Sequence, residues 1–433
     1  MTTKVIKRLG AGAIAITSAF ALAACGTSNP PTTTTTTTDT ATSAPSTSAD
    51  DPLAGLTSSS DPITLLFGSS GDAETAAVQA AAAAWSAQSG IQVTVTPADN
   101  LDQQMAQGFA SGSPADVFYL SPGALPGYAD AGNLLAYGDL LPNKGDFYQN
   151  LLNDYTYKGQ LYAAPKDFST LALVINDDMW TAAGLTASDY PTTWDQLQTV
   201  AKKLTTSSVV GLCVGAQYER LGALMVANGA NLMNADQTQA TANVQSNIDA
   251  LTFAQSMLKD GSMKFSADVQ NAGWGGECFG KGNAAMTIEG NWITGAMTSD
   301  YSNIKYTAVA LPKAPSGGQG TMEFSNGWGI AKDSKNQKAA VQLVEYMTTV
   351  TQQMAFSQAF GIMPSLQTAS SQYAAAFPAM KAFSDGAAYA QGVPTIKGAS
   401  QVITDLDNQL PTLATTDPKT ILDSAQSELQ ALL

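Results

Sequence analysis

Beyond residue 60, segments with the apolar pattern of a strand alternate with segments that have the pattern of a helix. Residues 63–67 form a short apolar run, residues 91–95 alternate apolar and polar, and residues 116–120 are again mainly apolar, so each segment predicts a strand. Between them, an Ala-rich stretch that Asp72 can cap, ending near residue 90, and residues 101–110 predict helices. Strands that alternate with helices predict an α/β fold with parallel-type layering.

Two later helices have clear start signals. Thr193 and Gln196 have the spacing of a capping box, and two lysines follow near the predicted helix end. Ser334 and Gln337 repeat the spacing before an apolar-striped helix that extends to about residue 349.

The first residues have the pattern of an export signal. Three basic residues precede an apolar stretch at 9–21, which is shorter than the roughly 20 residues of a spanning helix. Leu, Ala and Ala then precede Cys25, as in the lipobox of bacterial lipoproteins. We therefore expect residues 1–24 to be a lipoprotein signal peptide and Cys25 to be lipidated. The alternative is an ordinary secretory signal with a chance cysteine.

The segment after the signal has the composition of a linker. Residues 25–60 are rich in Thr, Ser and Pro and almost lack apolar side chains, so they cannot offset the entropy of ordering. We expect a disordered, lipid-anchored linker that holds the body outside the cell membrane, with the lipid as the sole membrane contact. Residues 61–433 are long enough for two domains.

The charge balance and the missing residue types narrow the chemistry. The chain has 35 acidic and 20 basic residues and a formal charge of -15, so it would be repelled by nucleic acid. It has no histidine, which excludes Ser-His-Asp and Cys-His catalysis and removes the commonest metal ligand. We expect no catalytic residue, metal or cofactor. Arg220 is the only arginine beyond the signal, which disfavours an anionic ligand.

Two cysteines remain once Cys25 carries lipid. An even pair in an exported protein predicts a disulfide between Cys213 and Cys278. Two separate buried thiols are the alternative.

Several short motifs, in this order, resemble the family 1 extracellular solute-binding proteins, which include the maltose-binding proteins. Each motif is weak alone, but their order and spacing behind a lipobox are specific. They lie at residues 159–176, 191–195, 279–286, 290–292, 311–312 and 327–332.

The resemblance implies a two-lobe periplasmic-binding-protein-like fold with hinge crossings and a cleft between the lobes. The N-terminal lobe would combine residues 61–166 and 328–385, and the C-terminal lobe residues 167–327 and 386–433. A monomer of this kind binds a sugar in the cleft and delivers it to the permease subunits of an ABC importer.

Three tryptophans are candidates for stacking on a sugar ring. Trp292 follows Gly290, where the family places a stacking aromatic; half-buried packing is the alternative. Trp274 lies among glycines and fits either a loop at the cleft or a lid over the disulfide. Trp328 lies between two glycines at a predicted crossing, which would let a ligand approach the backbone. The other tryptophans, Trp85, Trp180 and Trp194, have helical spacing and predict core packing.

Polar candidates follow the ends of predicted strands. Asp167 at the first crossing could face the cleft or pair with a lysine. Glu289 could contact sugar hydroxyls or have a structural role. The remaining candidates lie in loops after strands or beside Trp328; they are Ser69, Ser70, Ser121 and the weaker Asn326. Many relatives have an arginine after the late proline, whereas Ser365 and Leu366 follow Pro364 here, which puts a cleft role for that segment in doubt.

The sequence therefore predicts a lipid-anchored binding protein for a neutral di- or oligosaccharide. A secreted glycan-active hydrolase is one alternative, since Asp167, Glu277 and Glu289 could nominally supply a carboxylate pair. A surface adhesion lipoprotein is the other; it explains the tether but not the cleft motifs.

Overall fold

The computed structural model describes residues 51–433, which form one compact unit. The predicted signal peptide, Cys25 and the linker up to residue 50 lie outside the described residues. The helices are α1 (Asp72–Ser89), α2 (Leu101–Ser111), α3 (Leu125–Asp130), α4 (Gln149–Asp154), α5 (Asp177–Ala182), α6 (Trp194–Leu204), α7 (Tyr218–Ala227), α8 (Gln245–Lys259), α9 (Gly275–Gly280), α10 (Ile293–Ser299), α11 (Gln337–Met347), α12 (Val350–Phe360), α13 (Ser370–Ala376), α14 (Lys381–Gly386), α15 (Ala399–Gln409) and α16 (Pro418–Leu432). The strands are β1 (Ile63–Phe67), β2 (Val93–Pro97), β3 (Val117–Leu120), β4 (Thr156–Tyr157), β5 (Gln160–Leu161), β6 (Ala163–Asn176), β7 (Val210–Val214), β8 (Met263–Phe265), β9 (Ala284–Gly290), β10 (Tyr306–Val309), β11 (Thr321–Ile330), β12 (Met363–Pro364) and β13 (Ala390–Gln391).

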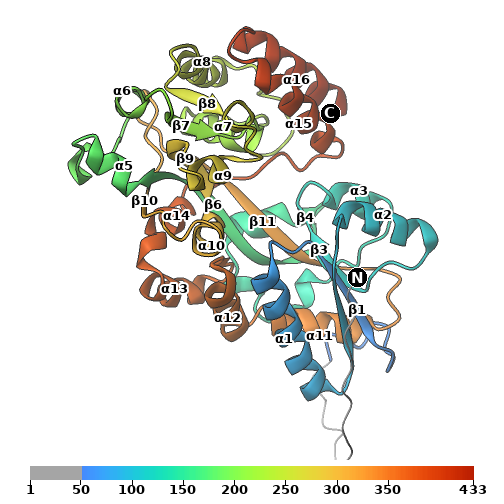
Figure 1. The fold of residues 1–433 in the computed structure, drawn as a ribbon. Helices are drawn as coiled ribbons and strands as arrows, with labels where there is room; N and C mark the ends of the chain where they lie inside the picture. The colour runs from blue at the N-terminus through green and yellow to red at the C-terminus, as the bar shows by residue number, and fades with distance from the viewer. Residues whose placement is uncertain (1–50) are drawn as a thin grey trace, which may run out of the picture. The chain divides into compact units, whose positions relative to one another are not determined.

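One mixed sheet runs through the unit in the order β2-β1-β3-β11-β6-β9-β7-β8. β1 pairs parallel with β2 and β3, and β7 pairs parallel with β8 and β9. β11 is antiparallel to both β3 and β6, and the two long strands β6 and β11 pass from one half of the unit to the other (Figure 1). The predicted α/β fold with two lobes is confirmed.

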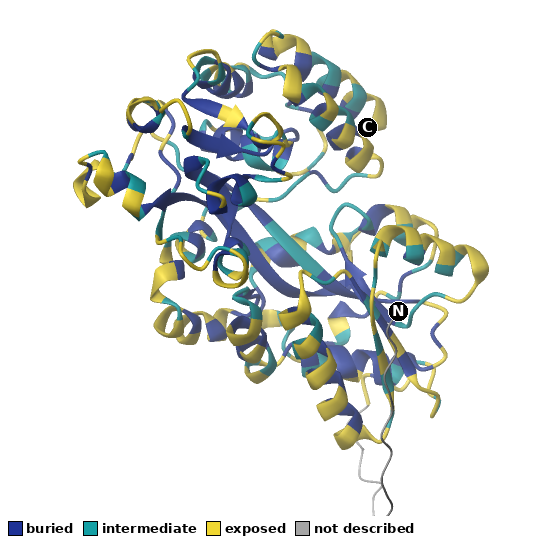
Figure 2. Ribbon diagram, viewed as in Figure 1, coloured by how far each residue is buried: buried dark blue, intermediate teal, exposed yellow. Residues whose placement is uncertain are grey.

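Two large apolar cores lie at the two ends of the crossing strands. The first core draws on residues 53–168 and 328–383, together with side chains from β6, α9 and α10. The second core draws on residues 171–322 and 399–429. We call the elements around these cores the first and the second lobe. Figure 2 shows the buried strands at the centre of each lobe, with exposed residues on the outer faces of the helices. The residue boundaries of the lobes stay a prediction.

The predicted early elements are present, with shifts at their ends. β1, α1, α2 and β3 lie close to the predicted ranges, whereas β2 starts two residues later than predicted because residues 91–92 do not join the ladder. Thr193 caps α6 as predicted by accepting from the Gln196 backbone N–H. Gly71, and not Asp72, is the N-cap of α1.

The predicted start of α11 is wrong. The helix begins at Gln337 with Asn336 as its N-cap. The hydroxyl of Ser334, which we expected to cap the helix, donates to Asp116 at 2.7 Å instead. This long-range bond ties the helix entry to β3, and no local sequence pattern reports it.

The folded unit begins before the predicted start at residue 61. Leu53 is buried in the first core, and Thr57 bonds both Ser334 and Gln337 at the start of α11. Lys338 pairs with Asp51 at 2.6 Å. Residues 51–60 therefore form a strap against the first lobe, although they share the polar composition of the segment before them.

Candidate ligand-binding site

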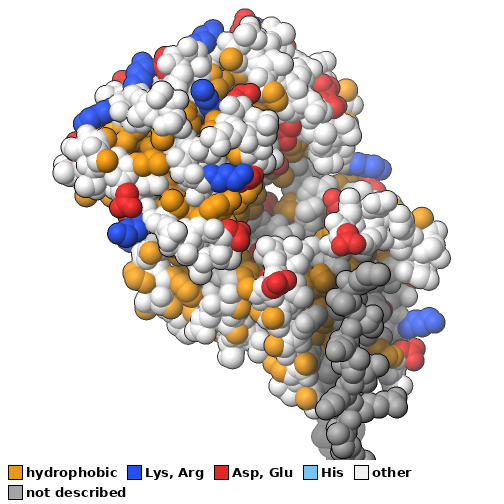
Figure 3. Space-filling model, in the orientation of Figure 1, with side chains coloured by type: hydrophobic (Ala, Val, Ile, Leu, Met, Phe, Trp, Pro, Cys, Tyr) orange, Lys and Arg blue, Asp and Glu red, His pale blue; other side chains and the backbone are white. Residues whose placement is uncertain are grey.

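The middle of β11 is the part of the crossing strands that solvent reaches. Phe324, Ser325 and Asn326 are half-buried, whereas the residues on either side of them in β11 are buried (Figure 2). Asn326 lies opposite Asp167 on β6. Figure 3 shows that the molecular surface is hollowed between the two lobes. The exposed middle of β11 lies at the junction of the lobes, where residues from both can meet a ligand.

A buried charge cluster marks the first-lobe side of this junction. The Nζ of Lys166 lies 2.9 Å from Oε1 of Glu74 and also contacts the Asp167 carboxylate. Ser70 donates to Oε2 of Glu74 through its backbone N–H at 2.8 Å and its hydroxyl at 2.7 Å. Tyr119 donates to Glu74 at 2.9 Å, and its ring centre lies 4.4 Å from the Lys166 Nζ. The loop after β1 is therefore bonded to the first crossing strand.

Burial and pairing set the charges of this cluster. Burial raises the pKa of Asp167, although Lys166 beside it favours the ionised carboxylate. Burial acts in the same direction on Glu74, but the Lys166 charge and the Ser70 hydrogen bonds outweigh it and lower the pKa of Glu74. Burial would lower the pKa of Lys166, yet the two carboxylates raise it. One ammonium is thus shared by two carboxyl groups, and it is not free to bind an anion.

A second cluster lies on the second-lobe side, around Glu289 at the end of β9. This carboxylate is fully buried, and its Oε2 accepts from Arg220 at 2.9 Å and from the Trp292 indole N–H at 3.2 Å. The Arg220 guanidinium carbon lies 5.3 Å from the centre of the Trp292 ring and 5.4 Å from that of Phe324. Burial raises the pKa of Glu289 against the opposing charge of Arg220.

Both candidate tryptophans at this end pack against a glycine two residues away in sequence. A Cβ at Gly290 would lie 2.2 Å from the Trp292 ring, and a Cβ at Gly276 would lie 2.0 Å from the Trp274 ring. Neither position can hold a side chain while the ring stays in place. Both indoles remain half-buried, so each keeps some exposed ring surface. Glycine is therefore needed here because an aromatic ring covers the backbone.

Contacts along β11 join the two clusters. Asn326 pairs with Asp167 across the two crossing strands, and the Ser325 hydroxyl donates to the Asp167 carbonyl oxygen at 2.7 Å. Two residues before Asn326, Phe324 meets the Trp292 ring edge-on, with the ring centres 5.0 Å apart. The structure thus links these predicted residues in one continuous chain of contacts from the first lobe to the second: Ser70, Asp167, Asn326, Trp292 and Glu289.

Trp328 is not part of this chain, and the prediction that it lines the ligand site is wrong. Its side chain has no exposed surface and packs edge-on against Tyr119 in the first core. A Cβ at Gly327 would lie 2.7 Å from the Tyr155 ring, and one at Gly329 would lie 2.8 Å from Phe118. The flanking glycines therefore admit core side chains and not a ligand.

Ser69 and Ser121 lie in the expected loops but make local bonds. The Ser69 hydroxyl bonds the Gly71 carbonyl and Thr75, and the Ser121 hydroxyl accepts from the Ala124 backbone N–H at the start of α3. Trp85, Trp180 and Trp194 are all buried, which confirms the predicted core packing.

The predicted disulfide between Cys213 and Cys278 is present. It joins β7 to α9, the helix that follows Trp274. Glu277, also on α9, pairs with Lys281 and accepts from the Gly273 backbone N–H at 2.6 Å. Trp274 is thus the N-cap residue of a short, covalently fixed helix.

Sequence reasoning missed most partners of the predicted residues. Lys166 lies in the motif at residues 159–176, and Arg220 stood out only for its rarity; the other missed residues are Glu74, Tyr119 and Phe324. A single arginine in a strongly acidic body is itself a signal, because such a residue is needed where a buried carboxylate requires a partner. Glu74 and Tyr119 lie far apart in sequence and have no comparable local signal.

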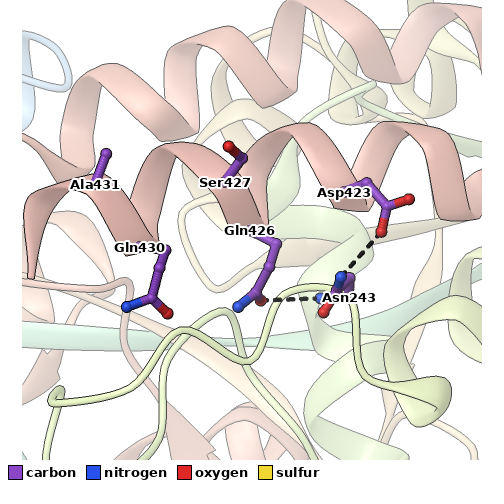
Figure 4. A pocket seen from close by; sticks show the side chains of 6 residues that line it. All are labelled: Asn243, Asp423, Gln426, Ser427, Gln430 and Ala431. Atoms are coloured by element: carbon purple, nitrogen blue, oxygen red, sulfur yellow. Dashed lines mark hydrogen bonds between the residues drawn. The ribbon is translucent and has the colours of Figure 1, made fainter.

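Two other features of residues 51–433, acidic side chains and a surface depression, do not provide an alternative ligand site. Within this range no three acidic or cysteine side chains gather to hold a metal ion. A shallow surface depression lies over α16, where the Asn243 amide donates to Asp423 at 2.9 Å and the Asn243 backbone N–H donates to Gln426 at 3.3 Å (Figure 4). These bonds hold the loop before α8 against the last helix, which is a structural role.

The chain is similar to known proteins in both sequence and fold. The model of the family described as bacterial extracellular solute-binding protein matches residues 68–354. A protein of Brucella abortus (strain 2308), named only as a binding protein, is 23% identical over 356 residues, which are 78% of this chain and 84% of that protein.

Two solved structures share the fold. One is an ABC substrate-binding protein of Listeria monocytogenes in complex with cycloalternan, and the other is the GacH receptor of Streptomyces glaucescens GLA.O, solved unliganded and with acarbose. Each has a TM-score of 0.75 and 19% identity, and each alignment covers 86% of this chain and 98% of that chain.

Proposed function

Because the chain belongs to the bacterial extracellular solute-binding protein family, we propose that it binds a neutral di- or oligosaccharide between its two lobes. It would then deliver the sugar to the permease subunits of an ABC importer. The Listeria and Streptomyces proteins were solved with cycloalternan and with acarbose, which supports a carbohydrate ligand.

One observation supports the location of the site above all others. A continuous chain of contacts runs from Ser70 through Asp167 and Asn326 to Trp292 and Glu289, along the exposed middle of a crossing strand. It combines carboxylates and amides, which bond hydroxyl groups, with an indole face, which covers the apolar face of a sugar ring. Trp274 borders the same end. We therefore assign sugar contacts to Trp292, Trp274, Asp167, Ser70 and Asn326, whereas the fully buried Glu289 would hold Trp292 in place by accepting from its indole N–H.

The charges of the site favour a ligand without net charge. Lys166 is shared between two carboxyl groups, and Arg220 is paired with Glu289. An anionic ligand would have to break one of these pairs and leave a buried carboxylate without a partner, which costs several kcal/mol (about 3–5). Uronic or sialic acids are therefore poor ligands.

The same pairs argue against a hydrolase. A glycosidase needs one carboxyl group to donate a proton and another to act as base or nucleophile across the scissile bond. Asp167, Glu277 and Glu289 each have a cationic partner within their own cluster. Such carboxylates are held as structural or hydrogen-bonding groups, and a role in binding alone accounts for them.

The export features complete the proposal. Cys25 would carry the lipid, the linker after it would span the distance from the membrane, and the body would act outside the cell as a monomer. Within residues 51–433 the structure contains no helix long and apolar enough to cross a membrane. A lipid at Cys25 would supply the membrane contact that the family's delivery role requires.

Tryptophan fluorescence and calorimetry with maltotetraose, cycloalternan and acarbose would test the proposal. We expect a saturable signal with at least one of the three and full recovery of the unaltered sugar by chromatography. Released shorter sugars would favour the hydrolase instead. Absence of any saturable response to these sugars and to a wider panel of neutral oligosaccharides would contradict a sugar-binding role.

A further inference from the structure

Helix α9 lies on the sheet face that bears Glu289. Cys213 on β7 is in register with Thr287 on β9, and Thr287 and Glu289 are two residues apart, so their side chains point to the same face. The disulfide from Cys213 to Cys278 holds α9 against this face.

The first residue of α9 touches the site directly. A Cβ at Gly275 would lie 2.6 Å from the Thr287 hydroxyl, 2.9 Å from Oε1 of Glu289 and 3.3 Å from the Cys213 carbonyl oxygen. The Gly275 backbone N–H approaches the Glu289 carboxylate and lowers its pKa, although Oε1 makes no hydrogen bond of good geometry. The spacing between α9 and β9 is thus as small as backbone atoms allow, and a small lift of the helix would remove this contact.

The side chains between α9 and β7 are small. The apolar cluster beneath the helix consists of small or modest side chains: Val210, Cys213, Ala272, Cys278 and Ala284. The chain that leads into the helix makes only one short 3-10 turn at Ser266–Asp268, and Gln270 and Asn271 both have φ of 53°. Phe279, four residues after Gly275 and therefore on the same face of the helix, packs into the first core. The covalent bond is what joins α9 to β7, in the sheet of the second lobe.

We propose that the Cys213–Cys278 disulfide is a positioning element of the ligand site. It holds Trp274 and Gly275 close to the sheet, where the Gly275 backbone meets the Glu289 carboxylate. Glu289 also accepts from the Trp292 indole N–H. Trp274 thus depends on one cross-link for its place beside Glu289, the hydrogen-bond partner of Trp292. This inference rests on the proposed sugar-binding function for its consequence, which is that loss of the bond weakens sugar binding while the fold persists.

The test compares the full chain with the double variant Cys213→Ala/Cys278→Ala. Calorimetry with maltotetraose, cycloalternan and acarbose gives the Kd, and hydrogen exchange read by mass spectrometry gives the protection of residues 272–283. We expect the Kd to rise at least about tenfold, since misplacing a binding group by about 1 Å has effects of this size or larger. We also expect faster exchange in residues 272–283 with little change in the β9 peptide.

Leu251→Ala is the matched control. Leu251 is fully buried on α8 in the second core, so the variant loses stability in the same lobe without a change at α9. It should retain the Kd and the exchange pattern of the unmodified protein.

The outcomes separate the inference from the function on which it rests. An unchanged Kd and unchanged exchange in the double variant would overturn the positioning role. An equal rise of the Kd in Leu251→Ala would also overturn it, because general loss of stability would then be the cause. If the unmodified protein bound neither these three sugars nor any of the wider panel of neutral oligosaccharides, the proposed function would fail, and exchange in residues 272–283 would still decide whether the disulfide holds the segment.

Discussion

Glu289 and Arg220 form a buried pair whose members depend on each other. The Arg220 side chain is 11% exposed and the Glu289 side chain 1% exposed, so neither charge has water as an alternative partner. Removing one member of such a pair costs far more than removing both, because a lone buried charge keeps its desolvation penalty.

We therefore expect Arg220→Met to lower the free energy of unfolding by about 3 kcal/mol at neutral pH. The loss should be smaller in acid, because a protonated Glu289 needs no cation. The double variant Arg220→Met/Glu289→Gln should recover most of the stability, and urea unfolding of all three proteins measures the coupling. Equal stability of the single and double variants would contradict the pairing.

Trp292 and Trp328 provide a matched pair for testing ring contacts. We expect Trp292→Ala to raise the Kd for a bound sugar about tenfold, because the proposed stacking ring is lost. Trp328→Phe should leave the Kd unchanged and lower the melting temperature, since that ring lies wholly within the first core. Calorimetry and thermal unfolding of both variants check this assignment; the reverse result would restore Trp328 as the ligand contact.

At the scale of elements, α4 and β11 bring two carboxyl groups together. Asp154 at the end of α4 lies beside Glu323 on β11, and the Asn150 amide donates to Glu323 at 2.5 Å. Burial raises the pKa of Asp154 to about 7, and burial together with the Asp154 charge raises the pKa of Glu323 well above its ordinary value. Each of the two carboxyl groups therefore keeps its proton to a higher pH in the folded protein than in the unfolded chain.

This pair makes stability depend on pH in a defined direction. A carboxyl group whose pKa is raised on folding contributes stability that is complete below its unfolded pKa near 4 and is lost as pH rises through the folded value. We expect the melting temperature to fall between about pH 5 and pH 8 and Glu323→Gln to flatten this dependence, because the amide can donate to an ionised Asp154. Asp407, whose pKa burial raises to about 6, leaves a residual slope in the variant. If the melting temperatures of the two proteins changed with pH in parallel over this range, the pair would be excluded as the cause.

Periodicity and local chemistry were enough to predict several elements. The apolar runs at β1 and β3 and the cap at Thr193 depend on neighbours within a few residues, and the structure has them as predicted. Trp328 was wrongly predicted to line the ligand site because its surroundings come from residues distant in sequence. Its glycine neighbours are explained by Tyr155 and Phe118, which reach them only because β11 pairs with strands distant in sequence.

The candidate site could be predicted in part. Trp292 and Asp167 were found from motifs, whereas the cluster that joins Glu74 to Lys166 spans 92 positions of sequence and forms only when β1 and β6 belong to one sheet. Pairing across such distances leaves no local signature, so sequence reasoning found single residues and missed most of their partners.

At the scale of the whole molecule, the two cores and the crossing strands predict a change of shape on binding. A ligand that contacts both lobes should favour the closed arrangement. We expect small-angle scattering to show a smaller radius of gyration when a sugar that binds is present at saturation, and the Trp292→Ala variant to need about ten times the sugar concentration for the same change. An equal radius with and without bound sugar would contradict closure.

The strap at residues 51–60 has a mechanical consequence. Any tension that enters from the N-terminal side acts first on Leu53 and on the bonds of Thr57 and Asp51 to the start of α11. β1 lies between two neighbouring strands and is the next element in line. We expect the strap to detach before force reaches the sheet, so that a pull on the N-terminal side of residue 51 leaves the proposed site between the lobes undistorted.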